Sequence, residues 1–414
     1  MKRNDILRQI ETGDTTWQEN LEAYILSAEP DELYQTSEDI AAYGFVEEAL
    51  EILKHLSYLF PEEEQLKVDQ AVWMLEVGRE EEGAELLQSV PEVSDAYPQA
   101  LLTMADYYQM TGLYEVAEQK LEQAIRLYPE EPILQLAKAE LKLETGRYLE
   151  AARIFENLWT LRSELPHVDL ARRLAETYSA GAAFEEAIPY YKEALLQGEA
   201  PDLLFQYGYA LFQTEQYQAA IQQLDEVIAI DPDYFSAYLL SSQAYAMLEE
   251  NEKALERIEQ GIEKDSFEKE YYLVAAKLAL KLGLEKKAES YFHEAIALDP
   301  EYIDAIIHLA QLYLHQEDYE AIIQLTEDVQ KDGSTLTSLY PYLAESHEQL
   351  ENYKQAHEFY ELAYTEQKED VYFLKKYAYF LLEEGKREKA KAIVRELQQL
   401  EPESMEWVAL LEDL

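Results

Sequence analysis

The sequence has 414 residues, of which 85 are acidic and 34 are basic, so its formal net charge at pH 7 is −51. A chain this acidic repels nucleic acids and anionic membranes and attracts basic partners, which comes close to excluding DNA or RNA binding. Apolar residues make up 48% of the chain, too many for a disordered acidic polymer, and only 13 Gly and 13 Pro are available to form turns between strands. We therefore expect a folded, helical protein.

The beginning of the chain and its amino-acid usage indicate a cellular location. The absence of cysteine removes disulfides, thiolate nucleophiles and cysteine-based metal sites, and it fits the reducing cytosol. Charges at Asp5 and Arg8 precede any apolar segment long enough for a secretory signal. The longest stretch without Asp, Glu, Lys or Arg, residues 234–248, is too short to span a membrane. We expect a cytoplasmic protein that does not insert into membranes.

Residues 1–30 are predicted to form an atypical helical cap, with helices over residues 4–9 and 17–28. The repeating pattern of the chain begins only after this segment. A stack in which each unit is buried against its neighbours must end with something different, because its last face would otherwise be exposed.

From residue 31 to residue 402, small side chains recur at intervals of 33 to 36 residues, mostly 34. With the exception of one Ile, the second-helix column consists of small residues: Ala49, Gly83, Ala117, Ala151, Ala187, Ala220, Ala254, Ala288, Ile322, Ala356 and Ala390. The first-helix column lies twelve residues earlier in each unit: Ser37, Ala71, Ala105, Ala139, Ala175, Gly208, Ser242, Ala276, Ala310, Ala344 and Ala378. Small residues let two antiparallel helices approach closely where they cross, so each unit is predicted to be a helix pair.

Larger apolar residues surround these columns at helical spacing. In the third unit, Leu101, Met104 and Tyr108 lie on the first predicted helix. Gly112 follows in the turn, and Leu121 lies on the second helix. This 34-residue helix–turn–helix pattern resembles the tetratricopeptide-repeat (TPR) family, although the Trp of the family's first position is replaced throughout by other bulky residues. The resemblance implies an all-α, right-handed superhelical solenoid of about eleven repeats with helical caps.

The array is irregular near residues 160–200. Extra residues fall at 162–168, the linker near residues 197–199 is short, and Pro189 lies within the second helix of the fifth repeat. Because proline removes a backbone hydrogen bond, we expect a local change in superhelical pitch. The alternative is an insertion tolerated in a surface loop.

Residues 403–414 are predicted to form a C-terminal capping helix with Trp407, Leu411 and Leu414 on one face. This face is apolar for a cap that meets solvent. We expect it to cover the last repeat, and the alternative is a homodimer contact through the same helix.

No motif for catalysis or metal binding is present. Gly385-Lys386 lacks the upstream glycine of a phosphate-binding loop, and the three His-Glu pairs lack a second His four residues after the first. His308 and His315 could share a helix face, but acidic neighbours are expected by accident in this chain. We predict no enzymatic activity, no cofactor and no metal; a hydrolytic enzyme is the least favoured hypothesis.

In the TPR family the first helices line a concave groove that holds extended or helical peptides. By resemblance, the floor of the groove is set by residues three before and one after the first-helix column. The predicted partner-binding groove comprises Leu102, Asp106, Leu136, Glu140, Glu176, Phe205, Tyr209, Phe212, Leu239, Leu273 and Ile307. We call Asp106, Glu140 and Glu176, in the first half of the array, the acidic posts. Together with the aromatic cluster at the sixth repeat, they suit a basic, amphipathic segment. Alternatively, the aliphatic members only pack against neighbouring first helices.

The leading hypothesis is a non-enzymatic scaffold or adaptor that binds a partner protein or a basic amphipathic peptide segment in this groove. The alternative is an intracellular peptide-sensing TPR regulator, in which a short peptide closes the superhelix and switches a partner protein. Both hypotheses assign the function to the surface of the repeats.

Overall fold

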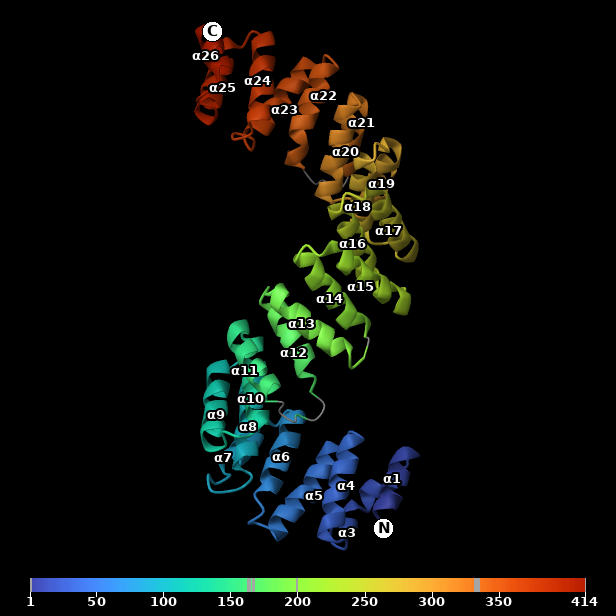
Figure 1. The fold of residues 1–414 in the computed structure, drawn as a ribbon, viewed down its shortest axis with the longest axis vertical. Helices are drawn as coiled ribbons and strands as arrows, with labels where there is room; N and C mark the ends of the chain where they lie inside the picture. Colours follow the sequence, from blue (N-terminus) through green and yellow to red (C-terminus); the bar gives the residue numbers. More distant parts are fainter. Residues whose placement is uncertain (1, 162–164, 166–167, 199, 331–335, 414) are drawn as a thin grey trace. The chain divides into compact units, whose positions relative to one another are not determined.

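The computed structural model describes residues 2–161, 165, 168–198, 200–330 and 336–413. Within these residues the chain forms α-helices and one short 3₁₀ helix and contains no strand (Figure 1). It divides into two compact units, Met1–Glu199 and Ala200–Leu414.

Among its described residues, the first unit contains three short N-terminal helices followed by five helix pairs. The short helices are α1 (Arg3–Glu11), α2 (Thr16–Glu19) and α3 (Leu21–Ile25). The pairs are α4 (Pro30–Ala42) with α5 (Val46–Leu59), α6 (Gln65–Glu76) with α7 (Glu80–Gln88), α8 (Tyr97–Met110) with α9 (Tyr114–Leu127), α10 (Pro132–Glu144) with α11 (Tyr148–Thr160), and α12 (Leu170–Ala180) with α13 (Phe184–Leu195).

The described part of the second unit contains six helix pairs and a final helix. The pairs are α14 (Pro201–Gln213) with α15 (Tyr217–Ile230), α16 (Phe235–Met247) with α17 (Asn251–Lys264), α18 (Lys269–Lys281) with α19 (Glu285–Leu298), α20 (Ile303–His315) with α21 (Tyr319–Gln330), α22 (Tyr340–Gln349) with α23 (Tyr353–Tyr364), and α24 (Val371–Glu383) with α25 (Arg387–Leu400). The 3₁₀ helix η1 (Thr337–Leu339) precedes α22, and α26 (Met405–Asp413) ends the unit. In both units most helices pack against the next one in the chain, so the predicted all-α repeat architecture is confirmed.

The two columns of mainly small residues form the contacts within the helix pairs. Each member is buried, including Ile322, the one bulky residue of the second-helix column. A Cβ atom added to Gly83 would lie 3.1 Å from the carbonyl oxygen of Ala71, its partner in the first-helix column. A Cβ atom on Gly208 would lie 3.2 Å from the side chain of Leu224. The helices therefore meet closely at the places that the sequence spacing predicts.

A left-handed backbone residue connects the two helices of every repeat, seven residues after the first-helix column. These residues are Gly44, Gly78, Gly112, Gly146, Ala182, Glu215, Glu249, Gly283, Glu317, Glu351 and Gly385, with φ between 55° and 89°. Glycine adopts this conformation without a steric penalty, whereas other residues pay about 1–2 kcal/mol. Five repeats therefore keep the same turn at an energetic cost.

The irregular segment near residues 160–200 is described only in part. Pro189 lies inside α13, which continues on both sides of it. The predicted insertion at 162–168 includes residues 162–164 and 166–167, and the short linker includes residue 199; these lie outside the described residues. The expected change of pitch therefore stays a prediction.

The N-terminal segment differs from the two helices expected there. The segment expected to form one helix over residues 17–28 is divided at Asn20 into two helices, α2 and α3. The second of these, α3, ends at Ile25. The side-chain amide of Asn20 donates a hydrogen bond to the carbonyl oxygen of Thr16. A side chain that competes in this way for backbone groups disfavours a continuous helix. Trp17 is buried and meets the ring of Phe45 edge to face at 5.0 Å.

The C-terminal helix α26 covers the last repeat with part of its predicted apolar face. Trp407 is buried, and its indole N–H donates a 2.9 Å hydrogen bond to Glu401. Leu411 packs against the same core, whereas Leu414 lies outside the described residues. A homodimer through this helix stays a prediction.

Candidate functional site

The predicted groove residues all lie on the first helices of their repeats. The first unit carries Leu102 and Asp106 on α8, Leu136 and Glu140 on α10, and Glu176 on α12. The second unit carries Phe205, Tyr209 and Phe212 on α14, Leu239 on α16, Leu273 on α18 and Ile307 on α20. Neighbouring first helices contact one another, as in α6 with α8, α8 with α10, α14 with α16 and α20 with α22. We call the surface that these helices form within each unit the first-helix face.

The aliphatic residues of the predicted groove are largely used for packing. Leu136 and Leu273 are buried in the core clusters of their repeats. Leu102 and Leu239 are half-buried and pack against similar clusters. These contacts favour the alternative that part of the predicted lane stabilises the stack, which leaves less apolar surface for a partner.

Two of the three predicted acidic posts are paired within the chain. Arg173 Nε lies 3.0 Å from Glu140 Oε1, and its guanidinium also reaches Glu176 at 3.3 Å. Arg172 Nε donates a 2.8 Å hydrogen bond to the other oxygen of Glu176. Burial raises the pKa of Glu140, and Arg173 opposes this effect. A partner's cation would have to compete with these arginines for both carboxylates.

Asp106 differs from the other two posts. It has no hydrogen-bond or ion-pair partner among the described residues. Solvent reaches the side chain, but the protein around it removes part of its hydration and raises the pKa of Asp106 to about 6. Leu102 lies one helical turn before it on α8. An unpaired, partly desolvated carboxylate beside an aliphatic side chain is suited to a cation on an amphipathic partner.

The aromatic residues at the sixth repeat are partly accessible. Phe205 is half-buried, and its ring lies 5.0 Å from that of Tyr234. Phe212 meets Tyr217 edge to face at 5.4 Å. Tyr209 is 40% exposed on the same helix, one turn after Phe205. Rings that are held by neighbours yet reach solvent can bind an apolar group with little loss of side-chain entropy.

Among the cavities lined by described residues, three each lie within a single unit. One of about 330 Å³ is lined by Tyr34 and Asp69, whose side chains are joined by a 3.0 Å hydrogen bond. A second, of about 410 Å³, lies beside the turns that follow α10 and α12. The third, of about 220 Å³, includes the predicted groove residue Ile307 together with Tyr342 and Tyr372. The sequence analysis missed this third cavity because both tyrosines lie outside the predicted lanes, two residues before Ala344 and six residues before Ala378 of the first-helix column.

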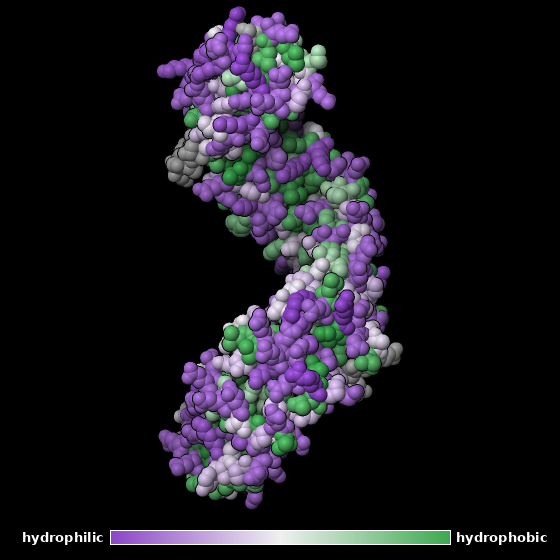
Figure 2. Space-filling view, turned by 90° about the vertical axis from the view of Figure 1, so that its left-hand side faces the viewer, coloured by the Kyte–Doolittle hydropathy of each residue, from purple (hydrophilic) through white to green (hydrophobic). Residues whose placement is uncertain are grey.

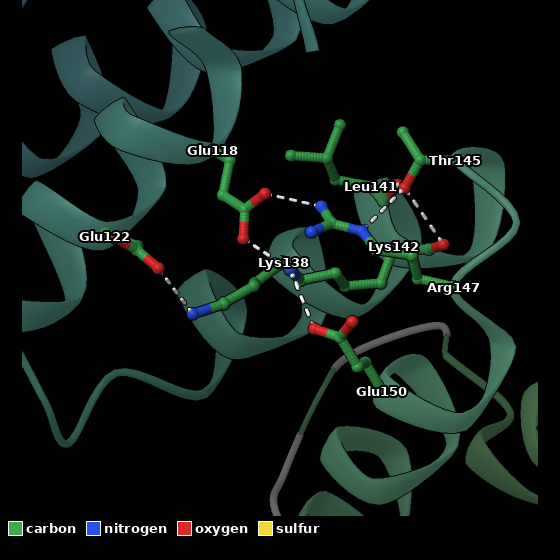
Figure 3. A network of polar contacts seen from close by, with 8 residues as sticks. All are labelled: Glu118, Glu122, Lys138, Leu141, Lys142, Thr145, Arg147 and Glu150. Atoms are coloured by element: carbon green, nitrogen blue, oxygen red, sulfur yellow. Dashed lines mark hydrogen bonds and ion pairs between the residues drawn. The ribbon is translucent and has the colours of Figure 1, made fainter. Parts of the chain in front are cut away.

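A network of ion pairs joins the third and fourth repeats (Figure 3). Lys142 on α10 is buried, and its ammonium group contacts Glu118 on α9 and, at 3.0 Å, Glu150 on α11. Arg147 reaches the other oxygen of Glu118 at 2.5 Å. The charges of this network satisfy one another, so we assign it to holding three helices together rather than to binding a ligand.

Neither a metal-binding cluster nor a membrane-spanning helix is found among the described residues. The described residues include no cluster of three or more His, Asp or Glu side chains that could hold a metal ion. In the same part of the chain, no helix combines the length and the apolar character needed to cross a bilayer. In Figure 2, polar residues cover most of the visible face, and apolar areas lie between them as separate patches.

Comparison with known proteins yields matches to TPR families. Models described as YpiA-like tetratricopeptide repeats match residues 109–162 and, for the C-terminal repeats, 341–404. General tetratricopeptide-repeat models match residues 172–235, 211–278 and 269–302. The TPR repeat-containing protein YpiA of Bacillus subtilis (strain 168) is 35% identical over 402 residues, which cover 96% of this chain and 94% of the relative.

Solved TPR structures are similar at lower identity. The C-terminal part of a TPR repeat-containing protein from Cytophaga hutchinsonii is 17% identical with a TM-score of 0.46, covering 66% of this chain and 98% of that one. YrrB, described as a TPR protein with an unusual peptide-binding site, is 20% identical with a TM-score of 0.38, covering 45% of this chain and 96% of that one.

Proposed function

Since this chain belongs to the YpiA-like family of tetratricopeptide-repeat proteins, we propose that it is a non-enzymatic, cytoplasmic scaffold that binds a partner protein on its first-helix face. The partner presents a basic, amphipathic segment. The scaffold contributes shape and charge, and it performs no chemical step.

The observation that carries this proposal is the unpaired carboxylate of Asp106. Within the described residues it has no cationic partner, whereas Glu140 and Glu176 both have one. Keeping a partly desolvated carboxylate without a partner costs folding free energy, so its presence on an exposed face is better explained by binding than by stability. The net charge of −51 adds long-range attraction for a basic partner.

The second unit offers an apolar contact of its own on its first-helix face. Phe205 and Tyr209 lie one turn apart on α14 and keep part of their rings accessible. Because apolar area supplies most of the affinity for an amphipathic segment, these two rings form a second contact for the partner, within the second unit alone.

Co-purification of the full chain with its partner, followed by binding measurements on the purified pair, tests the proposal. Asp106→Asn is expected to weaken binding about tenfold, which corresponds to about 1.4 kcal/mol. Glu115→Gln removes the same charge from an exposed position on α9 and should leave the affinity nearly unchanged. Phe205→Ala should also weaken binding, and added salt should weaken binding to the wild-type chain.

The proposal is rejected if Asp106→Asn and Glu115→Gln behave alike, or if binding is independent of salt and of Phe205. Recovery of a short peptide instead of a protein, identified by mass spectrometry of the purified chain, would favour a peptide-sensing regulator.

A further inference from the structure

The smallest of the three cavities lies on the first-helix face of the second unit. It has a volume of about 220 Å³ and lies among residues of α20, α22, α23 and α24. Ile307 and Pro341 contribute aliphatic walls, and Tyr342, Tyr372 and Phe373 contribute aromatic ones. Pockets for whole small-molecule ligands usually measure about 300–1,000 Å³. This cavity is therefore better matched to one long side chain.

The charges at the cavity favour a cation. Glu345 and Asp370 line it, and Glu348 accepts a 2.6 Å hydrogen bond from Tyr360, which forms part of its wall. Asp370 Oδ1 also accepts a 3.0 Å hydrogen bond from the backbone N–H of Phe373. The faces of tyrosine rings also attract cations.

The chain's own Lys376 already occupies this environment. It is the one basic side chain among the described residues that line the cavity. Its ammonium group forms an ion pair with Glu345 and lies 5.2 Å from the centre of the Tyr372 ring. The cavity thus holds an ammonium group between a carboxylate and an aromatic face.

Lys376 is the more exposed partner of this ion pair. Its side chain is 34% exposed, whereas that of Glu345 is 14% exposed. Tyr372 is 63% exposed, so one wall of the site can also move. A partly exposed lysine on a flexible stem regains hydration when it turns toward solvent, which offsets part of the lost ion pair.

We propose that this cavity binds an arginine or lysine side chain of the basic partner segment, and that Lys376 acts as a built-in competitor for the site. The inference rests on the proposed function for the identity of the partner. The arriving cation replaces Lys376 between Glu345 and Tyr372 and gains the charge of Asp370. Lys376 thereby lowers the affinity for single cationic groups, so a segment binds only when its other contacts compensate for the displacement.

A single-residue probe tests the cavity apart from the rest of the face. N-acetyl-arginine-N-methylamide is titrated against the full chain and followed by saturation-transfer NMR, with N-acetyl-glutamine-N-methylamide as the neutral probe. Lys376→Ala is expected to bind the arginine probe about fivefold more tightly, a change of about 1 kcal/mol. Lys389→Ala is the matched control, because Lys389 also pairs with a glutamate in this unit but lies outside the cavity.

Two further variants identify the groups that hold the cation. Glu345→Gln should weaken binding of the arginine probe at least fivefold, and it should also abolish the gain from Lys376→Ala in the double variant. Tyr372→Ala changes an exposed residue and should weaken binding about threefold. Unchanged thermal unfolding of each variant shows that the fold is retained.

Several results would overturn the inference. One is that Lys376→Ala and Lys389→Ala gain affinity for the arginine probe equally, or that Lys376→Ala binds it more weakly than wild type. Another is that the neutral glutamine probe binds as tightly as the arginine probe. A third is that the arginine probe binds neither wild type nor Lys376→Ala. The proposed function can survive any of these results, since it is measured on the partner and at Asp106. Conversely, if the proposed function is rejected, the binding of the single-residue probe to the cavity still tests this inference.

Discussion

The hydroxyl group of Ser242 donates a 2.7 Å hydrogen bond to the backbone carbonyl oxygen of Ala254, twelve residues later in the chain. Ser242 belongs to the first-helix column and Ala254 to the second-helix column of the same repeat. A side chain reaches the backbone of the opposite helix in this way only where both residues are small. The contact shows that the small residues, repeated every 34 residues, let the two helices of a repeat approach closely.

Enlarging a column residue should therefore destabilise the second unit. Ala276 is completely buried on α18, so Ala276→Leu should lower the free energy of unfolding by about 1–3 kcal/mol through overpacking. Urea denaturation combined with hydrogen exchange measures the loss. Glu252→Gln, at an exposed position on α17, should have almost no effect. Equal effects of the two changes would contradict the assignment of the columns.

The left-handed turns predict opposite effects of glycine in different repeats. Glu317 has a φ of 58°, so Glu317→Gly should leave stability unchanged or raise it by up to about 1 kcal/mol. Gly283 has a φ of 72° and open space around its Cα, so Gly283→Ala should cost about 1 kcal/mol from backbone strain alone. Thermal unfolding of the two variants checks both signs, and a loss in Glu317→Gly would show that its side chain stabilises the turn.

The buried ion pairs of the third and fourth repeats should make Lys142 sensitive to truncation. Lys142→Ala removes the buried cation between Glu118 and Glu150 and should cost about 2 kcal/mol, less than for an isolated buried pair because Arg147 still contacts Glu118. Lys142→Met keeps the packing of the aliphatic stem and should cost less. Chemical denaturation of the first unit measures both. Identical losses would show that packing is irrelevant at this position.

Asp106 should produce a pH-dependent difference in stability. Its pKa in the folded protein is raised to about 6 by desolvation, above the ordinary value of 3.8, so folding favours the protonated form. The wild type therefore loses stability relative to Asp106→Asn as the pH rises through about 4 to 6, and the difference should level off above that range.

Above this pH range, we expect the wild type to have lost about 1 kcal/mol of unfolding free energy relative to Asp106→Asn. The loss is this small because solvent reaches the carboxylate and screens part of the effect. Denaturation of both proteins at pH 4 and pH 8 checks it. A constant difference across this range would mean that the environment of Asp106 does not shift its titration.

Part of the candidate site could be predicted from the sequence. The phase of the small-residue columns places Asp106, Phe205 and Ile307 on first helices, because side chains on a helix repeat with a fixed period. The same phase cannot show that Arg173 reaches across from α12 to Glu140 on α10, since that contact depends on the offset between repeats. It also could not show that Lys376 and Tyr372 meet Glu345 in one cavity.

The sequence by itself determined the helix pairs, their number and the faces they bury, because these follow from local periodicity and from the space that a small side chain leaves at a helix crossing. The tertiary structure decided which charges are neutralised and which are available to a partner. Ion pairs such as Arg173 with Glu140 and Lys142 with Glu118 depend on side-chain directions and distances of a few ångströms. Spacing along the chain does not specify these ion pairs, since a long charged side chain can reach several possible partners.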